Sequence, residues 1–343
     1  MIYPANKAFI YLTNRCNQNC RHCYLDSNPQ EIDGLKTSDI EMIIDDLLCA
    51  GVNRIHFDGG EPFIREDIFH LIDYASRAGA ILSFITNGSL VDESMLTKLK
   101  GKVRAINFSI DGARAETHDW LRRSKGSFNR ILKLLNFATK HFETNVWFVT
   151  NKSNFEETLD LPELLEKGES RPTRLAFYVP SKIGRGKDNW SSLGISGKEW
   201  MFHLKNMYKL TKKYDWIYYE MLGQAPNILT KDKSEKYKKC NIYRRDLVHI
   251  KWDGGVYFCS LLMKDKGFEI GNIKDHRFSR LWFDENIWKK MKRKILSATE
   301  NCNNCRNLEL CQRGCIAHFD NSLKRDYRCQ PDFVPLCSHV FYR

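Results

Sequence analysis

Residues 12–28 read LTNRCNQNCRHCYLDSN and place three cysteines, Cys16, Cys20 and Cys23, within eight positions directly after a short β-rich run. Three thiolates at this spacing can hold a metal, but a tetrahedral site requires four ligands. The motif therefore predicts one of two sites. Either a distant residue completes a zinc site, or the fourth position of a metal centre is left for another molecule.

The residues around this motif form a repeating pattern of β-rich runs and helical segments. The predicted strands occupy residues 8–13, 54–60, 81–88, 105–112, 145–151 and 174–180. Nearly continuous apolar strands separated by amphipathic helices are typical of a parallel sheet with helices on its faces. We therefore predict an α/β fold, a partial (β/α)6 TIM-like barrel, and expect ligands to bind beyond the carboxyl ends of its strands.

Polar or glycine-rich turns follow five of these strands. They read NRC (14–16), DGGEP (58–62), TNG (86–88), DG (111–112) and TNKSN (150–154). Each could be an ordinary turn, but the carboxyl ends of parallel strands meet at one edge of a sheet. We interpret the five turns as parts of a single site.

The segment TSDIEMIIDDLLCAG (37–51) predicts the first helix of the repeat. Ser38, with Glu41 three residues later and an apolar-periodic run beyond, is a candidate capping box. Cys49, near the end of this segment, stands apart from the other cysteines. We expect it to be a buried small hydrophobic residue.

Composition and charge exclude several classes of protein. No apolar run reaches the roughly 18 residues that span a bilayer, and the first cysteine motif begins too early for a cleaved secretion signal. We therefore expect a cytoplasmic protein with no membrane partner, in which twelve cysteines favour metal or redox chemistry over disulfides. The net charge is +12, but no aromatic-interleaved recognition pattern accompanies the basic runs 233–239 and 288–296. We expect a solvated surface or an acidic peptide partner there, and no nucleic acid.

Three regions of the chain differ in character. Residues 1–185 hold the β/α repeat, residues 186–239 form a predicted helical bridge, and residues 240–343 contain eight of the twelve cysteines. In the last region, DGG (253–255) between two short β-rich runs predicts a hairpin turn.

The CxxxCxxC motif, combined with GGEP after the next strand, resembles the radical S-adenosylmethionine (SAM) enzymes. In that family three cysteines hold a [4Fe–4S] cluster, and SAM fills the fourth iron through its amino and carboxylate groups. The resemblance implies that Cys16, Cys20 and Cys23 hold such a cluster and that the open position is the cofactor site. It also implies a 5′-deoxyadenosyl radical that abstracts hydrogen from a substrate. A zinc site would leave the glycine-rich turns unexplained.

The same resemblance implies roles in SAM binding for residues of these turns. The GGEP turn contacts the methionyl amino group in the family, and here it consists of Gly59, Gly60, Glu61 and Pro62. Asp58, just before it, stands where threonine is commonest, and His22 takes the aromatic position of the cysteine motif. The positions that resemble those lining the ribose and the carboxylate are Thr86, Asn87, Ser109, Asp111 and Arg122. An ordinary arginine on a helix surface is the alternative interpretation of Arg122.

The cysteines from residue 240 onward carry a second signature. Its elements are, in chain order, Cys240, Gly254, Cys259 and the run Cys302-x2-Cys305-x5-Cys311-x3-Cys315. Together with the later cysteines they resemble the cysteine-rich SPASM domain, which carries two auxiliary iron–sulfur clusters in radical SAM maturases. A zinc ribbon is the alternative.

The resemblance also implies ligands for the two auxiliary clusters. Those of cluster I are Cys240, Cys259 and Cys315, and those of cluster II are Cys302, Cys305, Cys311 and a late cysteine. Cys329 and Cys337 both qualify as this last ligand, and the PLC sequence around Cys337 favours Cys337. The family often has a further cysteine shortly before Cys240, which is missing here, so cluster I is either open or closed by Cys329. Alternatively, Cys329 is a free thiol that donates a hydrogen atom to a substrate radical.

Three functions are compatible with this machinery. The first, which we favour, is modification of a ribosomally synthesised peptide by cross-linking, oxidation or epimerisation. The second is action on a small molecule such as a sugar, an aminoglycoside or a tetrapyrrole side chain, and the lack of an obvious N-terminal leader-binding domain supports it. The third, an iron–sulfur scaffold or redox sensor, would leave GGEP without a role. The expected partners are a flavodoxin- or ferredoxin-like electron donor and, for a peptide, a separate leader-binding protein.

Overall fold

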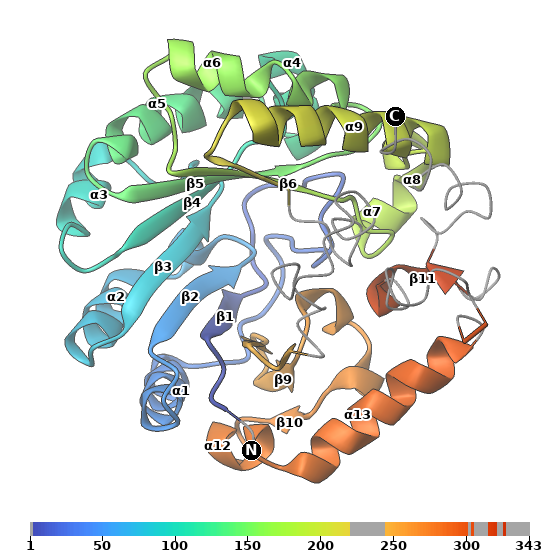
Figure 1. The fold of residues 1–343 in the computed structure, drawn as a ribbon. Helices are drawn as coiled ribbons and strands as arrows, with labels where there is room; N and C mark the ends of the chain where they lie inside the picture. The colour runs from blue at the N-terminus through green and yellow to red at the C-terminus, as the bar shows by residue number, and fades with distance from the viewer. Residues whose placement is uncertain (1–2, 220–243, 301–302, 305–314, 321–324, 327–343) are drawn as a thin grey trace.

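The fold is organised around one curved sheet (Figure 1) in a computed structural model that describes residues 3–219, 244–300, 303–304, 315–320 and 325–326. The six central strands are β1 (Lys7–Thr13), β2 (Arg54–Gly59), β3 (Ile81–Thr86), β4 (Ala105–Ser109), β5 (Glu143–Val149) and β6 (Arg174–Tyr178). Each of them pairs in parallel with the next. All six lie where the sequence predicted strands, so the β/α repeat is confirmed.

Helices connect the strands and cover the outer face of the sheet (Figure 1). They are α1 (Thr37–Cys49), α2 (Ile68–Arg77), α3 (Glu93–Lys98), α4 (Ala115–Arg122), α5 (Ser127–Thr139) and α6 (Leu161–Lys167), with the short 3-10 turns η1 (Pro62–Ile64) and η2 (Glu156–Thr158). Phe57, Phe84 and Phe108 on three adjacent strands are fully buried. Such side chains form the core between the sheet and its helices.

The sheet continues beyond the six predicted strands at both edges. At one edge, β7 (Ile217–Tyr219) pairs in parallel with β6. At the other, β8 (Leu247–Ile250) pairs in parallel with β1, and the antiparallel strands β9 (Gly255–Tyr257) and β10 (Gly271–Asn272) follow. The order is β10-β9-β8-β1-β2-β3-β4-β5-β6-β7, so the sheet of the described residues is not closed. The partial barrel is confirmed, with more strands than the six predicted.

Ring contacts across the concave face show how strongly the sheet curves. His56 on β2 stacks with Trp147 on β5 with their ring centroids 5.6 Å apart, although β3 and β4 lie between these strands. Trp147 also contacts Tyr178 on β6, and His56 contacts Phe9 on β1. These side chains therefore point to the inside of the partial barrel.

The segment predicted as a helical bridge contains three helices and one strand among its described residues. The helices are α7 (Arg185–Asp188), α8 (Trp190–Leu193) and α9 (Gly197–Lys213). Ser196 and Glu199 form a capping box at the start of α9, in which the Ser196 N–H donates to the Glu199 carboxylate at 2.7 Å. The strand β7 was not predicted, because three residues are too few to show a β periodicity. Residues 220–243 lie outside the described residues, so the domain boundaries stay predictions.

The described C-terminal residues begin with the predicted hairpin. Gly254 lies between β8 and β9 at φ +94°, and a Cβ there would meet Asn272 Oδ1 at 2.5 Å, so the turn requires glycine. The remaining elements are η3 (Ser260–Leu262), η4 (Lys266–Phe268), α12 (Phe278–Trp282), α13 (Glu285–Ala298), η6 (Ile316–His318), β11 (Phe319–Asp320) and β12 (Arg325–Asp326). The Trp282 indole donates to Tyr3 O at 3.0 Å and so joins α12 to the segment that precedes β1.

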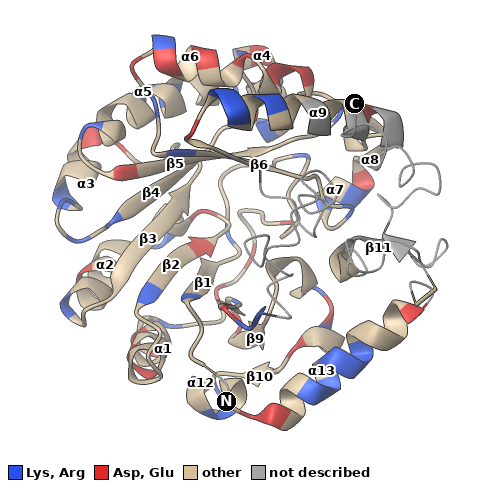
Figure 2. Cartoon of the chain, in the orientation of Figure 1, with Lys and Arg blue, Asp and Glu red and all other residues tan. Residues whose placement is uncertain are grey.

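The basic run 288–296 lies on α13, along which Figure 2 shows its lysines and arginine in blue. The helix buries Trp288, Met291 and Ile295. Its basic residues are all exposed. Lys294 lies over the Phe268 ring, with Nζ 4.0 Å from the ring centroid. The other four, Lys289, Lys290, Lys292 and Arg293, we call the α13 basic face. The surface prediction for this run is confirmed, while residues 233–239 lie outside the described part of the chain. Among the described residues, no helix is long and apolar enough to cross a bilayer.

Two expectations for α1 were wrong. The helix begins at Thr37, and the Lys36 N–H donates to the Asp39 carboxylate at 2.8 Å, so the cap does not involve Ser38 and Glu41. Cys49 is exposed. At 3.6 residues per turn it lies roughly opposite the buried Ile40, because nine residues advance the helix by about two and a half turns.

Candidate active site

The cysteine loop, residues 14–28, leaves β1 at the carboxyl edge of the sheet. Cys16 and Cys20 are 7% and 8% exposed, and Cys23 is half-buried. The Cys16 N–H donates to Asn28 O at 3.2 Å, and the Cys23 N–H donates to Cys20 O at 3.3 Å. These backbone bonds fold the loop back on itself, so the three thiols belong to one compact segment.

Burial determines the protonation of Cys16 and Cys20. It raises the pKa of Cys16 to about 12 and that of Cys20 to about 11. Neither group is a thiolate at neutral pH without a bound cation, even though Arg122 lowers the pKa of Cys20. Among the described residues, no three His, Cys, Asp or Glu side chains converge as the ligands of a single metal ion would. An iron–sulfur cluster fits this donor set better, because it binds each thiolate through a different iron and supplies the positive charge.

The GGEP turn after β2 lies directly against the cysteine loop. The Glu61 N–H donates to Arg15 O at 2.9 Å. A Cβ on Gly60 would lie 2.1 Å from Arg15 O and 3.0 Å from Cys16 Cβ, so this approach of two backbones is open to glycine alone. The structure therefore brings the two motifs together, as predicted.

Glu61 links the GGEP turn to the TNG turn after β3. Its fully buried carboxylate accepts hydrogen bonds from Thr86 Oγ at 3.0 Å and from the Asn87 N–H at 2.8 Å. Burial raises the pKa of Glu61 to about 7. Asn87 Nδ2 in turn lies 3.8 Å from Cys16 Sγ. Glu61 thus positions Asn87 against the cysteine loop.

Three further predicted residues lie on the same edge of the sheet. Gly59 takes φ +140°, and a Cβ there would lie 2.4 Å from Thr13 O. Pro62 is buried at the start of η1, and Ser109 is half-buried at the end of β4. Their roles in cofactor binding stay predictions.

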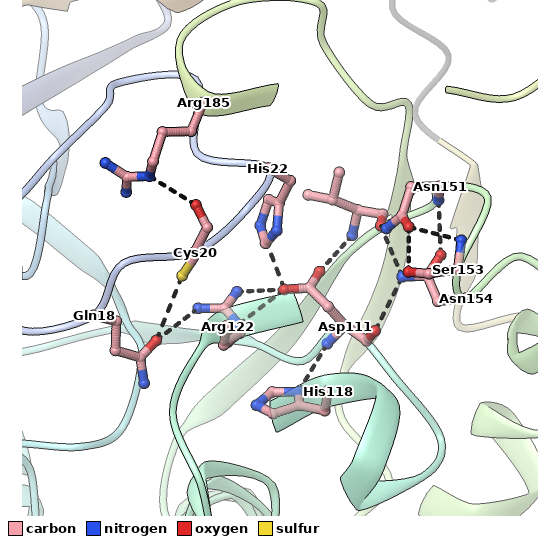
Figure 3. A network of polar contacts seen from close by, with 11 residues as sticks. Gln18, Cys20, His22, Asp111, His118, Arg122, Asn151, Ser153, Asn154 and Arg185 are labelled. Atoms are coloured by element: carbon pink, nitrogen blue, oxygen red, sulfur yellow. Dashed lines mark hydrogen bonds and ion pairs between the residues drawn. The ribbon is translucent and has the colours of Figure 1, made fainter. Parts of the chain in front are cut away.

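A buried ion pair forms the other half of the site (Figure 3). Arg122 Nε and Nη2 donate to Asp111 Oδ2 at 2.8 and 2.6 Å, and Asp111 Oδ1 accepts from the Val149 N–H at 2.7 Å. Burial favours a raised pKa for Asp111, but Arg122, His22 and the Val149 N–H together outweigh it and lower the pKa. Arg122 is only 7% exposed, so it is not an ordinary surface arginine.

This pair contacts the cysteine loop (Figure 3). His22 Nε2 lies 3.6 Å from Asp111 Oδ2, and Arg122 Nη1 donates to Gln18 Oε1 at 3.5 Å. Gln18 Nε2 and His22 Nδ1 are buried and have no hydrogen-bond partner in the described part of the chain. Buried polar atoms are rarely left unsatisfied. Two such atoms beside the thiols fit a bound cofactor that completes their hydrogen bonds.

The ion pair gives a testable prediction for stability. Asp111→Asn leaves Arg122 buried without a counter-charge, and we expect the free energy of unfolding to fall by about 3–5 kcal/mol. Urea denaturation under anaerobic conditions measures this loss. Because the pKa of Asp111 is lowered by folding, the wild type should lose the same stabilisation as pH falls below about 4, the value of a free aspartate.

A matched control removes an exposed ion pair. Glu163 and Lys167 lie 2.6 Å apart on the surface of α6. Glu163→Gln should cost far less stability than Asp111→Asn, because water screens exposed pairs. Equal losses for the two variants would contradict the assignment of Asp111 and Arg122 as a buried charged pair.

Sequence reasoning missed Arg185, in the turn after β6. Its Nε donates to Cys20 O at 2.9 Å, and its N–H donates to Cys23 O at 3.0 Å. A Cβ on the preceding Gly184 would lie 2.6 Å from Cys23 O. The available signal was an arginine between two glycines in a polar turn at the same edge of the sheet.

Two of the eight C-terminal cysteines lie among the described residues. Cys259 follows β9 and is half-buried, and Cys315 is 5% exposed. The other predicted ligands lie outside the described residues, namely Cys240, Cys302, Cys305, Cys311, Cys329 and Cys337. The assignment of ligands to the two auxiliary clusters stays a prediction.

Comparison with known families finds two matches along the chain. A model of the radical SAM superfamily matches residues 10–165. A model of SPASM, an iron–sulfur cluster-binding domain, matches residues 240–306. The first match contains the cysteine loop, GGEP, TNG and the Asp111–Arg122 pair, and the second contains Cys240, Cys259, Cys302 and Cys305.

Individual relatives cover most of the chain. It is 28% identical over 347 residues to the AdoMet-dependent heme synthase of Methanosarcina barkeri, covering 97% of this chain and 95% of that protein. It is 28% identical over 321 residues to the mycofactocin maturase MftC of Mycolicibacterium smegmatis, covering 89% of this chain and 76% of that protein. The fold resembles that of Streptococcus suis SuiB bound to the precursor peptide SuiA, with a TM-score of 0.75 and 18% identity. The match covers 96% of this chain and 76% of SuiB.

Proposed function

Because the chain belongs to the radical SAM superfamily and carries a SPASM iron–sulfur domain, we propose that it modifies a ribosomally synthesised peptide. The chain is an enzyme that uses SAM, a SAM-binding [4Fe–4S] cluster and auxiliary iron–sulfur clusters. In our proposal the thiolates of Cys16, Cys20 and Cys23 hold the first cluster. The observation that carries this assignment is the close packing of GGEP against the loop with these cysteines.

The protein contributes binding, orientation and exclusion of water. When bound, the cluster and SAM supply a 5′-deoxyadenosyl radical that abstracts a hydrogen atom from the substrate. Glu61 and Asn87 hold two turns against the cysteine loop. The fork of Arg122 is oriented by Asp111, and we assign its Nη1 to the SAM carboxylate, since an arginine N–H suits a carboxylate oxygen.

A peptide substrate is supported by the relatives and by surface charge. MftC, which is similar over 89% of this chain, is named a maturase, and SuiB has been solved with a precursor peptide. The α13 basic face presents four positive side chains side by side. We propose that this face attracts an acidic segment of the peptide. An electron donor of the flavodoxin or ferredoxin type and a separate leader-binding protein complete the proposed set of partners.

A tetrapyrrole side chain is the second candidate substrate. The relationship to the heme synthase covers 95% of that protein. Anaerobic incubation with SAM and dithionite separates the candidates when a synthetic precursor peptide and a coproporphyrin are offered in parallel. Mass spectrometry should show a peptide that loses two mass units, or one that keeps its mass in ordinary water and gains about one mass unit in deuterated water. A modified porphyrin and an unchanged peptide would overturn the proposal.

The α13 basic face gives a prediction for binding. Reversing the charges of Lys289, Lys290, Lys292 and Arg293 should weaken binding of an acidic peptide, most strongly at low salt where screening is least. SAM cleavage without substrate should change little, because the face lies away from the cysteine loop. Fluorescence anisotropy of a labelled peptide at two salt concentrations measures the effect.

The control for this variant reverses four exposed basic residues elsewhere. Lys98, Lys100, Arg130 and Lys140 lie exposed on α3, on α5 and in the segments that follow them. Their reversal changes the net charge equally and should leave peptide affinity closer to wild type. Equal weakening by the two variants would mean that peptide affinity depends on net charge and not on the α13 basic face. No weakening by either variant would exclude the α13 basic face as the docking site.

A further inference from the structure

The base of the cysteine loop is held by charged side chains that the candidate site does not include. Arg15 Nε and Nη2 donate to Asp33 Oδ2 at 3.1 and 2.7 Å. Asp33 Oδ1 accepts a hydrogen bond from the Thr13 hydroxyl, whose oxygen in turn accepts the Arg15 N–H at 2.9 Å. Asp33 thus joins the end of β1 and the start of the cysteine loop to a segment 18 residues further along the chain.

A second arginine, Arg65, contacts the other side of Asp33. Arg65 directly follows η1, so it belongs to the turn that GGEP begins. It is 7% exposed, and its Nη1 lies 3.7 Å from Asp33 Oδ2. The same nitrogen donates to Leu12 O at 3.1 Å and to Leu35 O at 3.2 Å. Asp67 accepts from Arg65 Nε and Nη2 at 2.8 and 2.6 Å, so the guanidinium is fixed in place.

The segment that carries Asp33 also packs against the C-terminal hairpin. The next residue, Gly34, lies so close to the turn between β8 and β9 that a Cβ there would be 3.0 Å from Trp252 O. Gly34 O accepts a hydrogen bond from Lys274 Nζ at 2.6 Å. The position of Asp33 is therefore fixed from two sides, by the sheet and by the hairpin that leads to Cys259.

The Arg15–Asp33 ion pair closes a loop that contains all three thiols of the motif. Cys16 directly follows Arg15, and Cys20 and Cys23 also lie between the paired residues in the sequence. Holding the two ends of a segment together restricts the conformations that the residues between them can adopt. The ion pair therefore limits the arrangements of the thiols even before a cluster binds.

Arg15 also forms the contact between the cysteine loop and GGEP. Its carbonyl oxygen accepts the Glu61 N–H at 2.9 Å, and Gly60 packs directly against the same oxygen. The Arg15 side chain is 33% exposed, so its orientation depends on the carboxylate that binds it. A change at Asp33 is thus transmitted through one residue to both motifs of the site.

Building on the assignment of the first cluster to Cys16, Cys20 and Cys23 in the proposed function, we propose that Asp33 is a positioning residue for this cluster and for SAM. It acts through Arg15, by holding the cysteine loop and its contact with GGEP in the arrangement that both groups require. Residues that support metal ligands in this way typically contribute about 10- to 100-fold to metal affinity or activity.

Asp33→Asn removes this contact without leaving a buried charge unpaired. Arg65 keeps its ion pair with Asp67 at 2.6 Å, and the Arg15 side chain still reaches water. We therefore expect the variant to fold. Arg15→Gln removes the same contact from its more exposed side and is the second variant.

The first measurement uses cluster-free protein. Hydrogen exchange of the backbone amides of residues 14–28, followed by mass spectrometry, should be about 10-fold faster in both variants, as expected for the loss of one charge-assisted hydrogen bond. The matched control is Asp215→Asn, which removes the partner of Arg171 in an exposed arginine–aspartate pair with a separation of 3.1 Å. This control should exchange as wild type does over residues 14–28.

The second measurement uses cluster-loaded protein reduced with dithionite and needs no substrate. SAM changes the electron paramagnetic resonance spectrum only of the cluster that it binds. The SAM concentration that produces half of this change should rise by about 10-fold in both variants. Leu135→Ala, which opens a cavity between α5 and the sheet, controls for a general loss of stability and should bind SAM as wild type does.

Three results would overturn the proposal. They are wild-type exchange over residues 14–28 in both variants, wild-type SAM affinity in both variants, and equally weakened SAM binding in Leu135→Ala. A failure of the cluster assignment is recognised separately, because the variant with all three cysteines of the motif replaced by alanine would then still show the spectral response to SAM. Faster exchange in Asp33→Asn would in that case show that Asp33 holds the loop, but not for this cluster.

Discussion

Replacing Cys16, Cys20 and Cys23 together by alanine should remove about four iron atoms per chain and abolish SAM cleavage. The three thiols lie in one compact loop, and burial raises the pKa of Cys16 and Cys20 far above neutral, so these two have no evident role except as ligands. Iron analysis and chromatography of 5′-deoxyadenosine measure the two losses. The auxiliary clusters should remain, because their predicted ligands all come from residue 240 onward.

The control for this variant is Cys49→Ala. Cys49 is exposed at the end of α1, away from the cysteine loop, so its loss should change neither iron content nor activity. Formation of 5′-deoxyadenosine by the triple variant would show that another part of the chain generates the radical.

The second large effect is expected from adding a single methyl group. In Gly60→Ala the new Cβ would lie 2.1 Å from Arg15 O and 3.0 Å from Cys16 Cβ. Backbone cannot yield as the end of a flexible side chain does, so the cysteine loop must move. A displacement of about 1 Å in a catalytic site can cost about 100-fold, and we expect SAM cleavage to fall by at least that factor.

The control for Gly60→Ala is Gly79→Ala. At Gly79 no heavy atom lies within 4 Å of an added Cβ, although its φ of +93° makes any side chain strained. This variant should lose about 1–2 kcal/mol of stability and keep its activity. Full SAM cleavage by Gly60→Ala, with normal iron content, would contradict the close packing of GGEP on the cysteine loop.

The six central strands could be predicted because each is a run of apolar residues that ends in a polar turn. β7 could not, since its three residues carry no periodic pattern and it joins the sheet only through its pairing with β6. The misplaced cap of α1 has a similar cause. Ser38 was expected to precede the first helical residue, but that position is occupied by Lys36. Asp39 is therefore the third helical residue, and its carboxylate accepts the Lys36 N–H.

Much of the candidate site followed from the rule that the turns after parallel strands meet at one edge. The sequence could not show how the side chains there pair. Arg122 was expected near the cofactor carboxylate, and this stays a prediction; its ion pair with Asp111 was not foreseen. Arg185 reaches Cys20 O from the turn after β6, a contact set by the curvature of the sheet. Such pairings depend on tertiary geometry that no local pattern records.

The most direct test of peptide modification measures the transfer of a deuterium atom from the peptide to 5′-deoxyadenosine. A synthetic precursor peptide is made fully deuterated on carbon and incubated anaerobically with loaded enzyme, unlabelled SAM and dithionite. We expect 5′-deoxyadenosine to be heavier by about one mass unit, because the radical takes its hydrogen directly from the peptide. Unlabelled 5′-deoxyadenosine alone, together with label transfer from a deuterated coproporphyrin, would contradict it.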